Sequence, residues 1–270
     1  MSLIGGRAEE FSVCFFMEKN HMKTVKTKQS KPQIAIVALG GSIVFPHLFE
    51  QGGLNIPFLK AFRKFVLEQV KIGRRFIIIV GGGKASRVYQ NATREITDCK
   101  PDDLDWMGIE ITKINALLII NILKEVACPQ IMRRQPTPQE VKSFLRSNKK
   151  VLVGSGWKPG QSTDYNALKS AELFGVGEVI IAGDSAFVCD KDPKKFAGAI
   201  PMKEVSWADY QKLIPDKWVP GMSTPVDPTA ARLGRRTKII AKTIKGTDLG
   251  NFEKAISGQP FEGTIIGGVK

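Results

Sequence analysis

Histidine, cysteine and long apolar runs are scarce in this chain of 270 residues. It contains two histidines and four cysteines, and the cysteines (Cys14, Cys99, Cys128 and Cys189) form neither a CxxC motif nor a cluster with histidine. This scarcity argues against a zinc site and against a disulfide framework, and it favours a reducing, cytoplasmic setting. No apolar run approaches the roughly 20 residues that a membrane-spanning helix needs. We therefore expect a cytoplasmic protein that does not associate with membranes.

Acidic residues are also few relative to basic ones. The chain has 40 lysines and arginines against 26 aspartates and glutamates, a formal net charge of +14, and only +3 of this falls in residues 1–31. A basic body favours anionic partners such as phosphorylated metabolites or nucleic acid. The basic clusters at 148–150 and 232–236 have no interleaved aromatic side chains on which bases could stack. Phosphorylated small molecules are therefore favoured over nucleic acid.

Two kinds of segment alternate from Gln33 onward. Short apolar runs predict strands at 34–39, 76–80, 130–134, 150–155, 178–183, 237–242 and 263–267. Amphipathic patterns predict helices at 57–72, 84–97, 105–126, 138–147, 226–235 and 248–257, and one more helix closes the stretch 153–175. Such alternation indicates a mostly parallel sheet covered by helices on both faces. We expect one domain over residues 32–270, preceded by a disordered basic extension over 1–31.

Three of the predicted strands end in glycine-rich loops. The first is followed by "GGS" (40–42), the second by "GGGK" (81–84), and the strand at 150–155 by "GWKPGQSTD" (156–164). Glycine lets the backbone approach a ligand closely, and the amides at a following helix N-terminus bind anions. Each loop alone could be an ordinary tight turn, but three together could hold several phosphates. Neither a P-loop nor a GxGxxG motif is present.

An ordered set of motifs carries a resemblance that runs from about Gln33 to the C-terminus. The motifs are "GGS", "VGGGKASR", "DWMGIEITKINALLI", "GWKPGQSTDYNAL", "CDKDPKKF" and "VDPTAA". Together they resemble the amino acid kinase family and, within it, the archaeal-type UMP kinases. The resemblance implies a three-layer α/β/α sandwich, an acceptor-binding half over about 32–176, an ATP-binding half over about 177–270, and a homohexamer. It also implies transfer of a phosphoryl group from ATP to UMP with Mg²⁺, in pyrimidine nucleotide biosynthesis.

The resemblance also implies roles for individual residues. The UMP-binding positions are Gly82, Asp105, Trp157, Lys158, Pro159, Gly160, Gln161, Ser162 and Thr163. The ATP-binding positions are Gly41, Ser42, Gly83, Arg87, Gly183, Asp184, Cys189 and Asp192, and the catalytic positions are Asp164, Lys158 and Arg87. No residue is assigned as a metal ligand. The residue types suit these roles, because a carboxylate can accept both vicinal hydroxyls of a ribose and an arginine fork can reach two phosphate oxygens.

Structural roles compete with some of these assignments. Ser162, Thr163 or Asp164 could cap the helix that follows them, a use worth about 1 kcal/mol. Asp105 could likewise be a helix N-cap, and Arg87 could be solvated. Asn115, with Thr112 on the same predicted helix, could either reach the acceptor pocket or pack in the core.

The chain departs from the family pattern at two places. Ala38 stands where many members have a lysine that bridges the phosphates, so we expect that charge to come from Lys158 or, second, from Lys84. On the donor side "GDSAFVCDKDP" (183–193) stands where related kinases have a sequence like "TNVDGVYDKDP". Cys189 thus replaces a tyrosine, and Phe187 is the candidate to take the place of that ring against adenine.

Three functions are consistent with the sequence. The first is a UMP kinase. The second is another phosphotransferase of the same family, acting on an amino acid, a carbamate or an isoprenoid phosphate. The third is a phosphate- or nucleotide-binding protein that has lost catalysis, which the altered donor segment could indicate. The motifs "DWMGI" and "STD" favour a nucleotide acceptor, and hence the first.

Overall fold

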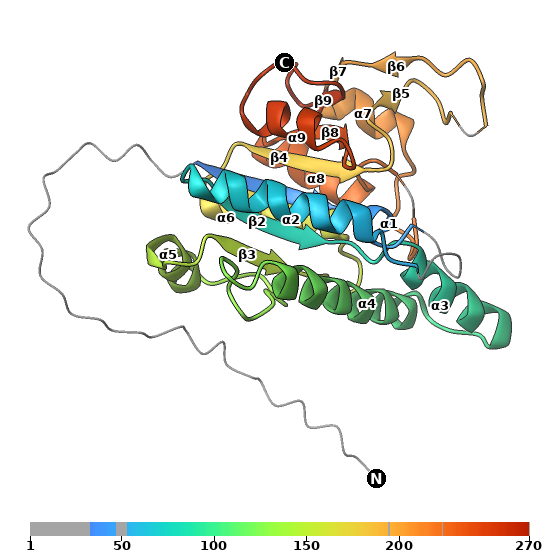
Figure 1. Ribbon diagram of the computed structural model, residues 1–270. Coiled ribbons are helices and arrows are strands. Elements are labelled where there is room, and N and C mark those ends of the chain that lie inside the picture. The colour runs from blue at the N-terminus through green and yellow to red at the C-terminus, as the bar shows by residue number, and fades with distance from the viewer. Residues whose placement is uncertain (1–32, 47–52, 194, 223, 270) are drawn as a thin grey trace, which may run out of the picture.

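A computed structural model describes residues 33–46, 53–193, 195–222 and 224–269 (Figure 1). The extension expected over 1–31 lies outside the described residues. The strands are β1 (Ile34–Leu39), β2 (Arg75–Val80), β3 (Val151–Gly154), β4 (Glu178–Gly183), β5 (Val188–Cys189), β6 (Pro201–Met202), β7 (Glu204–Val205), β8 (Ile240–Lys245) and β9 (Thr264–Ile266). The helices are α1 (Gly41–Val44), α2 (Ile56–Lys71), α3 (Gly83–Ile96), α4 (Pro101–Ile122), α5 (Pro138–Arg146), α6 (Thr163–Phe174), α7 (Trp207–Leu213), α8 (Pro228–Thr237) and α9 (Leu249–Ile256).

Seven strands form one sheet in the order β3-β2-β1-β4-β8-β9-β7, and β5 pairs with β6 in a separate hairpin. Within the seven-stranded sheet, neighbouring strands run parallel except β8 and β9, which are antiparallel. The sheet is therefore mostly parallel, as predicted. Its register brings the ends of β1 and β2 level, with Leu39 beside Val80. The loops that follow these two strands consequently begin side by side.

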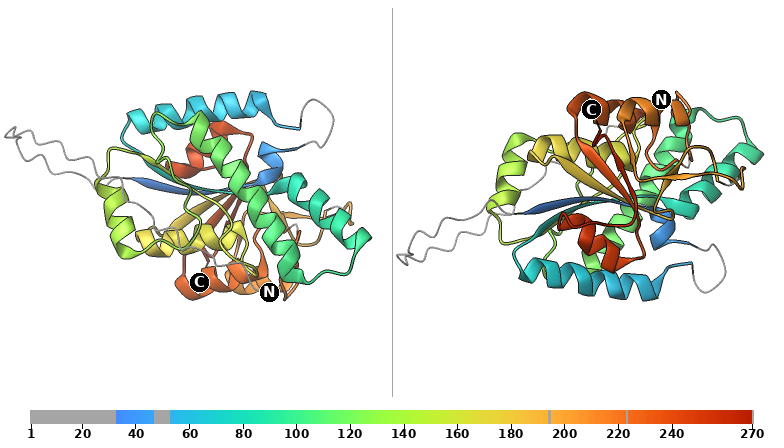
Figure 2. Two further views of the ribbon diagram at one scale, coloured as in Figure 1. Left: turned by 90° about the horizontal axis from the view of Figure 1, so that it is seen from below. Right: turned by 90° about the horizontal axis from the view of Figure 1, so that it is seen from above.

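Two apolar clusters fill the two sides of the sheet. Along β1 the side chains of Val37 and Leu39 belong to one cluster and those of Ile36 and Ala38 to the other, as the period of a strand requires. Helices α2, α4 and α9 complete the first cluster, and α5, α6, α7 and α8 the second. Figure 2 shows α2 and α9 on one face of the sheet and α6 and α8 on the opposite face. The three-layer α/β/α sandwich is confirmed.

Local signals fix where several helices begin. Helix α5 starts with a reciprocal capping box between Thr137 and Glu140, followed by Pro138 in the first turn. Helix α6 is capped by Ser162, whose hydroxyl accepts from the Tyr165 amide at 2.9 Å, and it ends at Gly175 in the left-handed region (φ 66°). Each side-chain cap stabilises its helix by about 1 kcal/mol.

The predicted elements differ from the observed ones at two places, residues 130–134 and the segment after residue 183. Residues 130–134 form no strand: Met132 makes only an isolated bridge to Gly154. No helix or strand was predicted between 183 and 226, but this part of the chain contains α7, whose Trp207 and Tyr210 pack into the core. None of the helices in the described parts of the chain combines the length and the apolar character that crossing a membrane requires.

Candidate active site

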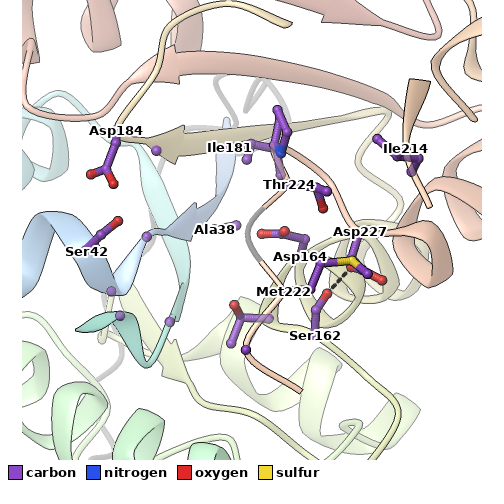
Figure 3. Close-up of a pocket in the computed structure, with 18 of the residues that line it drawn as sticks. Ala38, Ser42, Ser162, Asp164, Ile181, Asp184, Ile214, Met222, Thr224 and Asp227 are labelled. Carbon is purple, nitrogen blue, oxygen red and sulfur yellow. Dashed lines mark hydrogen bonds between the residues drawn. The ribbon is translucent and has the colours of Figure 1, made fainter. Parts of the chain in front are cut away.

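An open cavity of about 980 Å³ lies beyond the carboxyl ends of β1, β2 and β4, where ligands bind in parallel sheets. Its volume is at the upper end of the range for small-molecule sites. Figure 3 shows Ser42 and Asp184 on one side of it and Ser162 and Asp227 on the other. Residues from both halves of the chain therefore face one space.

The loops after β1 and β2 are in direct backbone contact. A Cβ atom at Gly41 would lie 2.2 Å from the Gly83 amide nitrogen, and one at Gly83 would lie 2.3 Å from the Gly41 carbonyl carbon. Gly83 also has a φ of 66°, a conformation that favours glycine. Asn115 fixes the second loop further, because its amide donates to the Gly81 carbonyl at 2.8 Å. The glycines are thus required for the two loops to meet.

Two helices, α1 and α3, begin at the cavity. Helix α1 begins after Gly40 and α3 after Gly82, and neither N-cap supplies a side-chain acceptor. Gly41, Ser42 and Gly83 at these starts line the cavity. Amides left without a side-chain cap, together with the dipole of α3, form a favourable environment for phosphate oxygens.

An acidic group occupies the opposite wall. The Ser162 hydroxyl donates to Asp227, a residue only 2% exposed, and the other carboxylate oxygen of Asp227 accepts from the Thr229 amide at 2.8 Å, which caps α8. Asp164 lies beside this pair and its carboxylate is directed into the cavity (Figure 3). Burial raises the pKa of Asp164 well above its usual range, and the negative charge of Asp227 raises it further. A cation or a cationic ligand bound at this wall would stabilise the ionised form of Asp164.

The loop between β3 and α6 is anchored at two points. Trp157 is buried, and its indole donates to the Met132 carbonyl at 3.2 Å. The amide of Gly160 donates to Asp105 at 2.8 Å. Lys158, between them, is exposed and does not line the cavity. Trp157 is thus buried, while the neighbouring Lys158 is exposed to solvent.

Another side of the cavity is formed by the end of β4 and by the hairpin β5–β6. Gly183, Asp184 and Cys189 line it, and Phe187 also faces it. The hairpin is tied to the sheet by the Thr264 hydroxyl, which accepts from the Val188 amide at 2.9 Å. An aromatic ring is therefore present on this side although the tyrosine of related kinases is replaced.

Most of the residues that the sequence singled out are brought together. Those that line the cavity are Gly41, Ser42, Gly82, Gly83, Arg87, Asp105, Gln161, Ser162, Thr163, Asp164, Gly183, Asp184, Cys189 and Asp192. Trp157, Lys158, Pro159, Gly160 and Lys84 are not among the lining residues. Their proposed roles, and those of the lining residues, stay predictions. Asp105 lies within α4, so it is not the N-cap of that helix.

Several lining residues had no assigned role in the sequence. Asp227 belongs to the motif "VDPTAA", whose Asp-Pro pair indicates a helix start but not its contact with Ser162. Trp218 donates to Asp105 across 113 positions of sequence. Among the described residues, the cationic side chains that line the cavity are Arg87, Lys191 and Lys195. Lys158 and Lys84, which the sequence suggested as sources of positive charge, are not among them.

The residues present fit a magnesium ion that is shared with phosphates. Mg²⁺ is usually held by one or two carboxylates together with phosphate oxygens and water. Asp164, a half-buried carboxylate close to that of Asp227, fits this donor set. Within the described parts of the chain no cluster of three histidine, cysteine or acidic side chains is placed to hold a metal ion by itself. Nucleotide phosphates would therefore have to complete the coordination.

Known proteins share both the sequence and the fold. The amino acid kinase family matches residues 33–242. Uridylate kinase of Methanocorpusculum labreanum is 32% identical over 233 residues, which cover 86% of this chain and 94% of that protein. Uridylate kinase of Methanocaldococcus jannaschii is 31% identical and is covered over 97% of its length. The crystal structure of uridylate kinase from Archaeoglobus fulgidus superposes with a TM-score of 0.69 at 26% identity, covering 87% of this chain and 99% of that one. The chain belongs to the amino acid kinase family, and within it resembles the archaeal uridylate kinases.

Proposed function

We infer that this protein is a UMP kinase, which transfers the γ-phosphoryl group of ATP to UMP and releases ADP and UDP. The observation that carries this inference is the single cavity into which the loops after β1 and β2, Asp105 and the donor hairpin all face. The similarity of the chain to uridylate kinases over most of its length supports UMP as the acceptor. We place the reaction in the cytoplasm, where it would supply pyrimidine nucleotides.

Phosphoryl transfer asks a protein chiefly to position two phosphates and to neutralise the charge that develops on the moving group. In our proposal the amides of Gly41 and Gly83 bind phosphate oxygens at the point where their loops touch. The guanidinium of Arg87, on α3, neutralises the charge between donor and acceptor. Asp105 accepts the ribose hydroxyls of UMP, and Asp164 orients the cationic groups around the reacting phosphates. A bound magnesium ion would supply further neutralisation of the donor phosphates.

The acceptor preference tests the proposal. With Mg-ATP, turnover of UMP is expected to exceed that of CMP, AMP and GMP by at least about tenfold, because a pocket that hydrogen-bonds one base rejects others. A coupled assay for ADP across the four monophosphates measures this. Preferred turnover of an amino acid or of carbamate would point to another phosphotransferase of the family. Binding of UMP without turnover would point to a protein that has lost catalysis.

We also propose that the protein assembles as a homohexamer through α4. Ile114 and Leu117 lie one turn apart on this helix and are 62% and 43% exposed, while its opposite face packs on the sheet. Exposed apolar side chains on one face of a long helix suit contact with a second copy of the chain.

Charged substitutions on this face are expected to dissociate the assembly. The double variant Ile114→Lys and Leu117→Lys should elute as a smaller species, because two unpaired ammonium groups would have to be buried at the contact. Light scattering on the eluting protein gives the mass. Ile72→Lys, at an isolated isoleucine after α2 that is 74% exposed, serves as the control and should keep the wild-type mass. A monomeric wild-type protein at micromolar concentration would contradict the hexamer.

A further inference from the structure

A tight turn places Trp218 at the cavity. Residues Val219–Met222 form a β-turn in which the Met222 amide donates to the Val219 carbonyl at 3.1 Å. Pro220 and Gly221 occupy the two central positions, and Gly221 has a φ of 82°. This combination of residues and dihedral is typical of a type II turn. The preceding Trp218 is therefore held by a backbone conformation that the sequence Pro-Gly strongly favours.

The turn rests on α3. Arg94 donates to the Pro220 carbonyl at 2.9 Å. Gly221 packs so closely on the helix that a Cβ there would lie 3.0 Å from the Gln90 side-chain oxygen and 3.7 Å from Arg87. Trp218, Val219, Gly221 and Met222 all line the cavity. The segment thus covers the acceptor side of the cavity, next to the residues proposed to bind the phosphate.

The indole of Trp218 occupies both oxygens of Asp105. Its Nε1 lies 3.0 Å from one carboxylate oxygen and 3.3 Å from the other. Asp105 is only 8% exposed, and the Gly160 amide is its other partner, at 2.8 Å. Trp157 and Trp207, by contrast, donate to backbone carbonyls in the core. Trp218 therefore makes a bond that a ligand could replace.

We propose that Trp218 and the ribose of the acceptor nucleotide compete for Asp105, so that Trp218 sets which acceptors bind. This inference rests on the proposed function, because it takes Asp105 as the ribose site. A vicinal diol has two donors and can replace the indole at both oxygens. A sugar with one hydroxyl can take only one oxygen and leaves the other to Trp218.

The competition affects the affinities of two acceptors, UMP and 2′-deoxy-UMP, to different extents. UMP must break the indole bond before it gains its own bonds to Asp105. Removal of the indole N–H therefore strengthens UMP binding. When 2′-deoxy-UMP binds, the indole can stay bonded to one oxygen of Asp105. Removal of the N–H therefore strengthens the binding of 2′-deoxy-UMP only slightly.

Calorimetric titration without ATP tests this on the full-length protein. In Trp218→Phe, which keeps an aromatic ring but has no N–H, the Kd for UMP is expected to fall about tenfold and that for 2′-deoxy-UMP to change by less than about threefold. Trp106→Phe, beside Asp105 in sequence and 47% exposed, is the matched control and should leave both values unchanged. UMP should also change the tryptophan fluorescence of the wild type, and this change should be absent in Trp218→Phe.

The outcomes separate the two proposals. If the wild type phosphorylates UMP but Trp218→Phe binds it equally or more weakly, the competition is wrong and the function stands. If both nucleotides tighten equally, Trp218 is only a steric barrier and its effect on acceptor choice is refuted. If the wild type neither binds nor phosphorylates UMP, the proposed function fails and the competition with it.

Discussion

Replacement of Asp164 by asparagine is expected to lower kcat by about tenfold to a thousandfold, or about 1.4–4 kcal/mol. The change keeps the size of the side chain and removes its charge. Because the carboxylate faces the cavity, its proposed task of orienting cations around the phosphates is lost. Helix α6 keeps its cap, since Ser162 and not Asp164 supplies the capping oxygen. Steady-state kinetics with saturating ATP and UMP give the effect on kcat.

The same variant is expected to resist heat better than the wild type at neutral pH. Burial and Asp227 raise the pKa of Asp164 above its unfolded value, so the folded state holds the proton more tightly. The stability that this gives is fully present below the unfolded pKa and is lost as the pH rises through the folded pKa. Asparagine does not ionise, so the variant does not lose this stability as the pH rises. Its gain in Tm over the wild type should therefore be larger at high pH than at low pH.

Thermal unfolding at acidic and at neutral pH measures this dependence. Asp98→Asn, at an exposed aspartate after α3, is the control and should show no comparable gain. A variant that loses stability at all pH values while kcat is unchanged would reduce Asp164 to a structural residue.

Replacement of Gly41 by alanine is expected to be the most damaging single change to the fold. The added Cβ would lie within 2.2–2.5 Å of backbone atoms of Gly81, Gly82 and Gly83. Backbone atoms cannot rotate away as a side chain can, so the two loops must separate. We expect a loss of about 3 kcal/mol or more in the free energy of unfolding, together with loss of turnover.

Urea unfolding followed by circular dichroism measures the loss. Gly177→Ala is the matched control, because a Cβ there meets no heavy atom within 4 Å. This control should unfold close to the wild-type midpoint and keep its activity. Wild-type stability in Gly41→Ala would show that the loops are not in contact.

The fold could be predicted largely because its strands are buried on both faces. Residues 76–80 of β2 are apolar and buried, so they appear in the sequence as an uninterrupted apolar run. The predicted strand at 130–134 failed for a related reason. Ile131 and Met132 are buried there, but only Met132 pairs with a strand. Burial makes a segment apolar whether or not it joins the sheet.

The site was predictable where its chemistry is local and not where it depends on tertiary contacts. A glycine loop after a strand is a local signal, and all three loops reach the cavity. The contacts of Ser162 with Asp227 and of Trp218 with Asp105 span 65 and 113 positions, which no local pattern reveals. Lys158 shows the remaining difficulty, because position in a loop does not tell which way a side chain points.

The hairpin β5–β6 lies outside the seven-stranded sheet, so its sequence can change separately from that of the sheet. The glycine loops of the cavity follow β1 and β2 inside the sheet, where a substitution disturbs the shared core. The hairpin has only two residues in each strand, and the Thr264 hydroxyl holds both strands, because it accepts from the Val188 amide and donates to the Met202 carbonyl. Cys189 lines the cavity from this hairpin, so a substitution there changes the cavity lining without disturbing the pairing of the seven-stranded sheet. The lining of the cavity on this side can therefore vary while the sheet stays the same.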